Sequence, residues 1–234
     1  MRILIVICLV LNALAGQAIC DSQFIPKKKP SSPSPEQKPG DIQVELGALA
    51  GTAEDIFDLA ALGKWYKIRK KVDDLKKRQK TINMLWTGEN NYFEQRLAHK
   101  IEKLDQAVAA KSAADVRIVS NNITFLEIAM MGELNPGSHA NVMLLGYCGR
   151  ELEILSEKKE MEKLNNLVIR IHLIWQGIIP QLVDKNASKE IKNFSDIMKH
   201  LENAKTPEEY SQSAGHIREE VSTIEHILNK HPKR

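Results

Sequence analysis

The sequence has 234 residues, of which 43% are hydrophobic, 5% aromatic and 27% charged, and its formal net charge is +3. This length and composition are typical of a soluble globular protein with one large domain or two small ones. A net charge so close to neutral gives no reason to expect nucleic acid or an acidic polymer as a partner.

Residues 1–20 have the pattern of a signal peptide. Arg2 supplies a positive charge, an apolar run follows from Ile3 to Leu11, and small residues precede a candidate cleavage site after Ala18. The apolar run is much shorter than the roughly 20 residues that span a bilayer. We therefore expect an exported protein whose mature chain has no transmembrane helix.

Cys20 has two possible roles. It follows the apolar run, as the lipid-modified cysteine of a bacterial lipoprotein does, although Ile19 is bulkier than the residue expected before such a cysteine. Without a lipid, Cys20 could form a disulfide with Cys148 in an oxidising compartment. We favour a third arrangement, in which Cys148 is a buried thiol that packs as a small hydrophobic side chain.

Residues 21–40 are rich in proline, lysine and serine. Such a segment buries too little apolar surface to offset the entropy lost on ordering. We expect a disordered, extended spacer between the signal peptide and the folded body.

From residue 41 onward, apolar residues recur at three- and four-residue steps, which predicts α-helices. In the first half we expect a short helix ending at Gly63 and then three longer helices. A break at residues 135–138 precedes four more helices, and Pro180 should kink or end the helix around it. The apolar stripes of the seven other helices begin at Trp65, Phe93, Val116, Val142, Met161, Ile191 and Ile217.

The two halves of this helical body resemble each other. Residues 82–86 match residues 171–175 at a separation of 89, and residues 110–112 match residues 204–206 at a separation of 94. We infer an internal duplication with a short insertion in the second copy.

The second match also predicts two helix starts. Ser112 and Thr206 are each followed three residues later by an acid, which is the pattern of a capping box. We therefore predict an all-α fold of duplicated four-helix units, residues 41–135 and 136–234, that form one or two helical bundles.

Three segments resemble uncharacterised bacterial exported helical-bundle proteins that are periplasmic or lipoprotein-like. They are residues 63–65 leading into 72–76, the Met-Gly-Glu-Leu-Asn-Pro segment at 131–136, and residues 145–153. The resemblance covers most of residues 50–230. It implies a location in the periplasm or cell envelope of a bacterium, and the group carries no activity that could be transferred.

The sequence has none of the common catalytic or cofactor motifs. It contains no C-x-x-C pair, no H-E-x-x-H, no P-loop and no G-x-S-x-G elbow. No glutamate is followed three residues later by a histidine, which argues against a helical di-iron site. We expect a protein that is not an enzyme and holds no cofactor, and that serves as a binding or structural module with an unknown protein or envelope surface as its partner.

A periplasmic haem- or metal-binding bundle is one alternative. Its candidate ligands are His139, Met143 and His172, because histidine and methionine on facing helices can act as axial ligands of haem iron.

Association with a membrane surface is a second alternative. The helix after Gly63 carries many basic residues and, of acids, only Asp73 and Asp74. Such a face could contact anionic lipid. The residues we expect to matter most in this face are Lys70, Lys71, Lys77 and Arg78.

Overall fold

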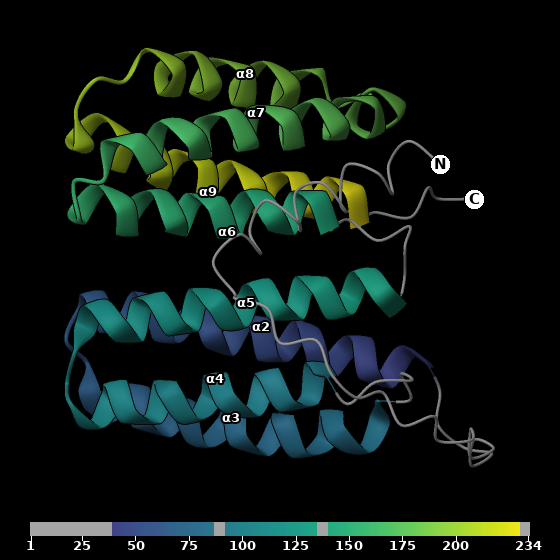
Figure 1. Ribbon diagram of the computed structural model, residues 1–234. Coiled ribbons are helices and arrows are strands. Elements are labelled where there is room, and N and C mark those ends of the chain that lie inside the picture. The colour runs from purple at the N-terminus through teal and green to yellow at the C-terminus, as the bar shows by residue number, and fades with distance from the viewer. Residues whose placement is uncertain (1–38, 87–91, 135–139, 230–234) are drawn as a thin grey trace, which may run out of the picture.

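The computed structural model describes residues 39–86, 92–134 and 140–229. The predicted signal peptide, Cys20, all but the end of the predicted spacer, and His139 lie outside these ranges. Within them the chain forms helices and no strand, which confirms the predicted all-α fold (Figure 1). The helices are α2 (Pro39–Ala61), α3 (Trp65–Leu85), α4 (Tyr92–Ala109), α5 (Ala113–Leu134), α6 (Ala140–Glu157), α7 (Met161–Asp184), α8 (Ser188–Asn203) and α9 (Pro207–Asn229).

Helices α2 to α5 form one four-helix bundle, in the lower half of Figure 1. Each helix packs against the next, and α5 closes the bundle against α2. The helices turn their apolar stripes toward a shared core, which includes the fully buried Leu49, Ile68, Leu104 and Ile123. Burial of each such side chain stabilises the fold by about 1.5–3 kcal/mol.

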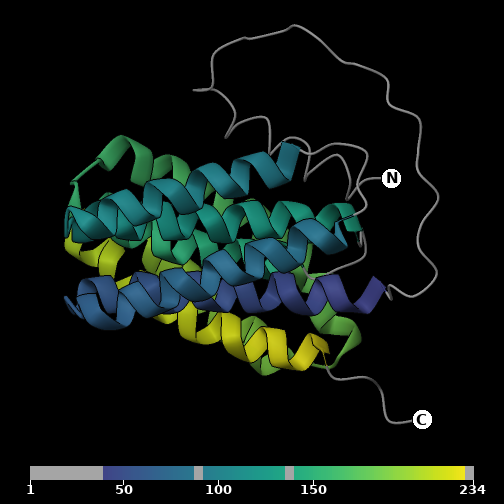
Figure 2. The ribbon, with the colours of Figure 1, turned by 90° about the horizontal axis from the view of Figure 1, so that it is seen from below.

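Helices α6 to α9 form a second bundle with the same order of neighbours, and α9 closes it against α6. Its core is drawn from residues 140 to 228, with Ile128 of α5 joining it. Trp175 stacks on Phe194 at a centroid distance of 4.3 Å inside this core. The helix axes of both bundles run in nearly the same direction (Figures 1 and 2).

Equivalent turns join the first two helices of each bundle. Gly63 and Lys159 both have left-handed backbone, with φ of 62° and 55°. Gly63 donates its backbone N–H to the carbonyl of Ala60 at 3.1 Å, and Lys159 donates to Ser156 at 3.0 Å. The two turns lie 96 residues apart in the sequence.

This separation corrects one of the two predicted repeat matches. At 96 residues, the buried Ile82 of α3 is equivalent to the buried Ile178 of α7, and not to Ile171 as the separation of 89 implied. The predicted match was wrong by seven residues. Seven residues are about two helical turns, so such a slip keeps the same apolar face and cannot be detected from the stripe alone.

The predicted match of residues 110–112 with residues 204–206 agrees with the structure at the starts of α5 and α9. Asp115 donates its backbone N–H to Ser112 Oγ at 3.4 Å before α5. Before α9, Glu209 donates to Thr206 Oγ1 at 3.3 Å and accepts from the Thr206 backbone N–H at 3.0 Å. Both predicted caps are therefore confirmed.

One prediction about helix length was wrong, and of the two outcomes expected at Pro180, a kink or a helix end, the end is excluded. The helix ending before Gly63 is 23 residues long and not short, because Ile42, Leu46 and Leu49 extend its buried face toward the N-terminus. Helix α7 runs through Pro180 to Asp184 instead of ending at the proline. Pro180 lies on the exposed side, where the backbone carbonyl that loses its helical partner can bind water.

The two bundles meet through the facing sides of α2, α5, α6 and α9, an interface that we call the seam. Its principal polar residues are Glu54, Asp58, Arg117, Asn121, Glu127, Arg150, Glu153, Arg218 and Glu225. None of the helices in residues 39–86, 92–134 and 140–229 combines the length and apolarity needed to span a membrane.

Candidate functional site: a polar seam between the two bundles

The seam buries charged and polar side chains deeply. Arg117 and Arg150 are only 5% and 4% exposed, Asn121 is 1% exposed, and Glu127 is fully buried. Side chains of these types are rarely buried to this extent unless they are paired. The partner of each charged group therefore decides whether that group stabilises the seam or is available to bind a ligand.

Arg117 of α5 ties the first bundle to α6. Its guanidinium forms ion pairs with Glu153, at 2.7 Å, and with Glu157. It also lies 4.4 Å from the centroid of the Phe57 ring of α2, a cation–π contact.

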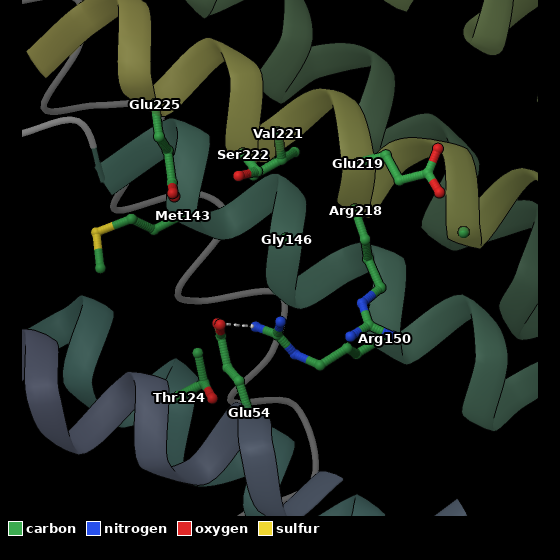
Figure 3. A pocket seen from close by; sticks show the side chains of 11 residues that line it. Glu54, Thr124, Met143, Gly146, Arg150, Arg218, Glu219, Val221, Ser222 and Glu225 are labelled. Carbon is green, nitrogen blue, oxygen red and sulfur yellow. Dashed lines mark ion pairs between the residues drawn. The ribbon is translucent and has the colours of Figure 1, made fainter. Parts of the chain in front are cut away.

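Arg150 of α6 reaches back to the first bundle. Its Nε donates to Asn121 Oδ1 at 3.0 Å, and its Nη2 lies 2.8 Å from Glu54 Oε1, the ion pair drawn in Figure 3. Burial lowers the pKa of Arg150, while the carboxylate of Glu54 favours its charged form. The guanidinium is thus held between α2 and α5.

Arg218 of α9 is also fully engaged. Its Nη2 donates to both carboxylate oxygens of Asp58, at 2.6 and 2.8 Å, and its Nη1 donates to Glu153 at 3.1 Å. These carboxylates keep the pKa of Arg218 high despite burial. The basic groups of the seam therefore already have acidic partners.

A cavity of about 490 Å³ opens in the seam between these pairs (Figure 3). Its lining comes from all four seam helices and is mixed in character. The charged lining residues are Glu54, Arg150, Arg218, Glu219 and Glu225; the remainder are Thr124, Met143, Gly146, Gly215, Val221 and Ser222.

Glu127 is a buried carboxyl group that has no partner in the part of the chain that the structure describes. It lies one turn after the cavity-lining Thr124 on α5, and neither of its carboxyl oxygens has a hydrogen-bond partner among the described residues. Burial, followed by the charges of Glu54 and Glu225, raises its pKa to about 8. Glu127 is therefore mainly protonated at neutral pH.

Glu225 shares this acidic end of the cavity. Burial raises its pKa, and so does the charge of Glu54, while Arg150 lowers it. The charge of Glu54 thus raises the pKa of both Glu127 and Glu225.

The structure does not bring the predicted haem or metal ligands together. Met143 lines the seam cavity, whereas His172 lies on α7, where its Nδ1 is 2.8 Å from Glu202 Oε1 of α8. His139 lies outside the described residues. In the part of the chain that is described, no group of three or more His, Cys, Asp or Glu side chains could hold a metal ion.

The predicted basic face is partly neutralised by a neighbouring helix. Lys71 pairs with Asp55 of α2 at 2.5 Å, and Arg78 pairs with Glu45 of α2 at 3.1 Å. Acids of α2, which packs against α3, therefore oppose these charges in addition to Asp73 and Asp74 of α3 itself.

The other two predicted basic residues interact within α3. Lys77 lies 3.9 Å from Asp74, and Lys70 lies 4.6 Å from the centroid of the Tyr66 ring. Both lysines are exposed.

Cys148 is buried within α6 as a free thiol. Burial raises its pKa to about 12, so the thiol stays protonated and packs as a small apolar group.

The seam residues were not identified from the sequence. On α5, Arg117, Asn121, Thr124 and Glu127 follow one another at three- and four-residue steps, beside the apolar stripe. A polar stripe of this kind is usually a solvated helix face. Only the presence of the second bundle turns it into a buried site.

No family model, curated protein or solved structure matches the chain. The resemblance to bacterial exported helical-bundle proteins therefore stays a prediction.

Proposed function

We propose that this protein is an exported, non-enzymatic binding module of a bacterial cell envelope, and that it binds a small molecule in the seam cavity. The observation that carries the proposal is a cavity of about 490 Å³ whose charged lining is contributed by both bundles. Its volume lies within the roughly 300–1,000 Å³ of small-molecule sites.

The unpaired carboxyl group of Glu127 supports binding over a purely structural role. A buried polar group without a hydrogen bond destabilises a fold by about 1–3 kcal/mol. An interface that only joined two bundles would be more stable with an apolar residue at this position. Glu127 does not line the cavity, but a ligand there that favours its ionised form would give this buried carboxyl group a function.

The sequence assigns no catalytic motif to this cavity, and its arginines are engaged in ion pairs with Glu54, Asp58 and Glu153. Paired groups of this kind position helices and shape a site. Binding without turnover is accordingly the function we propose.

A variant that blocks the cavity tests the proposal. Gly215 lines the cavity, and a Cβ atom added to it meets no heavy atom within 4 Å, so Gly215→Leu should occupy the opening without overlap. Gly51 is an exposed helical glycine of α2 with equally open surroundings, and Gly51→Leu is the matched control.

Each protein would be purified from its native envelope fraction and denatured, and the released small molecules identified by mass spectrometry. We expect one compound in stoichiometric amount from the wild type and from Gly51→Leu, and its loss from Gly215→Leu. Recovery of no compound from the wild type, or equal recovery from Gly215→Leu, would contradict the proposal.

A further inference from the structure

The acidic end of the seam cavity is lined by glutamates of two helices. Glu54 extends from α2 and Glu225 from α9, and their carboxyl groups point toward each other across the cavity, near Met143 (Figure 3). Glu127 of α5 is not part of the lining; it is fully buried one turn from the lining residue Thr124, and the charges of Glu54 and Glu225 raise the pKa of its carboxyl group. Two carboxyl groups therefore face the cavity from separate helices, and a third is buried in α5 behind the lining.

The basic groups at this end of the cavity are already ion-paired with acids, although Nη2 of Arg150, 2.8 Å from Glu54, makes no well-aligned hydrogen bond among the described residues. Arg150 is committed to Glu54 and Asn121, and Arg218 to Asp58 and Glu153. Neither oxygen of the fully buried Glu127 receives a hydrogen bond from a described residue. A ligand that fits must bring donors and positive charge.

We infer that the seam cavity binds an organic cation with a primary ammonium group on an aliphatic body. This inference rests on the proposed function. An ammonium group has three N–H donors and no acceptor, which suits the carboxyl groups of Glu54 and Glu225 that face each other in the cavity. Met143 and Val221 supply the apolar contact for the aliphatic part.

An organic cation fits better than a metal ion. Within the described ranges, no three His, Cys, Asp or Glu side chains are placed closely enough to coordinate a metal. An ammonium group reaches its acceptors through N–H bonds, at about 2.7–2.9 Å between heavy atoms, and so tolerates more widely spaced carboxylates than a coordinated metal does.

Binding of an ammonium group favours the ionised form of each neighbouring carboxyl group. The groups that face Glu127 are Glu54 of α2 and Glu225 of α9, and Arg150 of α6 lies beside both of these. Because Glu127 is protonated before binding, the complex should form with release of a proton to solvent.

Isothermal titration calorimetry with three probes of similar shape tests the inference. The full chain would be titrated at neutral pH with hexylamine, hexanol and hexanoate, in buffers of different ionisation enthalpy. We expect hexylamine to bind with one-to-one stoichiometry and proton release, hexanol to bind more weakly, and hexanoate not to bind.

Two charge-neutralising variants locate the binding. Glu225→Gln should weaken hexylamine binding at least about tenfold, because it removes one charge-assisted hydrogen bond. Glu162 is an exposed glutamate of α7, and Glu162→Gln should leave binding unchanged. Circular dichroism and the unfolding midpoint of each variant would show that it is folded.

Absence of hexylamine binding, equal binding of hexanoate, or unchanged affinity in Glu225→Gln would overturn the inference. These results leave the proposed function standing if a compound of another class co-purifies with the wild type and is lost from Gly215→Leu. If no compound co-purifies at all, the proposed function fails by its own test.

Discussion

The two bundle cores and the seam between them are buried to a similar depth but are stabilised differently. Leu49 and Leu145, at equivalent positions of the two cores, are fully buried and need only apolar neighbours. Arg117 and Arg150 of the seam are nearly as buried, and each is held by acids of an adjoining helix. Buried charge is stable only while it is paired, so the seam is the more specific and more easily altered region.

Removal of a seam arginine should have the largest effect. Arg150→Met keeps most of the volume but removes the cation that pairs with Glu54 and lowers the pKa of Glu225. We expect the free energy of unfolding to fall by about 3 kcal/mol or more, measured by urea denaturation. The control is Lys76→Met, whose ion pair with Asp105 is exposed and should matter by less than about 1 kcal/mol. An equal fall in the free energy of unfolding of Arg150→Met and Lys76→Met would show that a buried ion pair of the seam matters no more than an exposed one.

The pH dependence of Glu127→Gln should show the next largest effect. The pKa of Glu127 is about 8 in the folded protein and near 4.5 when unfolded. The stability that its protonation contributes is fully present below the unfolded pKa and is lost as pH rises through the folded pKa. A pKa difference of one corresponds to about 1.4 kcal/mol.

Between about pH 5 and pH 9, the free energy of unfolding of the wild type should therefore fall by several kcal/mol relative to that of Glu127→Gln. Denaturant unfolding at each pH measures this difference. The same comparison with Glu162→Gln should give parallel curves. Parallel curves for Glu127→Gln as well would show that this carboxyl group is not held protonated in the seam.

Glycine replacement should have a smaller effect on stability and a selective effect on binding. Gly215→Leu and Gly51→Leu each replace a helical glycine that has open surroundings, and each should stabilise its helix by about 0.5–1 kcal/mol. Thermal unfolding checks this expectation, and only Gly215→Leu should abolish hexylamine binding. Loss of binding in both variants would place the ligand outside the seam cavity.

The smallest effect is expected at His172. Its contact with Glu202 is half exposed, so His172→Ala should change the free energy of unfolding by no more than about 0.5 kcal/mol and leave hexylamine binding intact. An absorbance spectrum and elemental analysis of both proteins test the haem or metal alternative. Iron or copper that is present in the wild type and lost with His172 would favour that alternative over the seam.

Much of the fold could be predicted because large apolar residues at helical spacing define most of the helices. The early part of α2 was missed because Gly47, Ala50, Gly51 and Ala53 interrupt its large apolar residues, although Ala50 and Ala53 are buried. Alanine and glycine occur on both faces of helices, so periodicity cannot place them.

The site could not be predicted in the same way. Glu54 and Arg150 occupy equivalent positions, 96 residues apart, and they pair across the seam. A repeat separation of 96 residues would have suggested that these opposite charges occupy equivalent positions, but the separation predicted for this part of the repeat was 89. Even the correct repeat separation would not have predicted that Glu127 is buried, because its burial depends on how the two bundles pack and no local sequence pattern encodes that packing.

The central claim is that Glu127 is an unpaired carboxyl group buried beside a cavity that binds an organic cation. Carbon-13 NMR titration of the Glu127 carboxyl, assigned by comparison with Glu127→Gln, tests it most directly. We predict a pKa of about 8 in the free protein and a clear decrease when hexylamine is saturating, because the ammonium group stabilises the carboxylate. A pKa near 4.5 in the free protein, or one that hexylamine leaves unchanged, would contradict the claim.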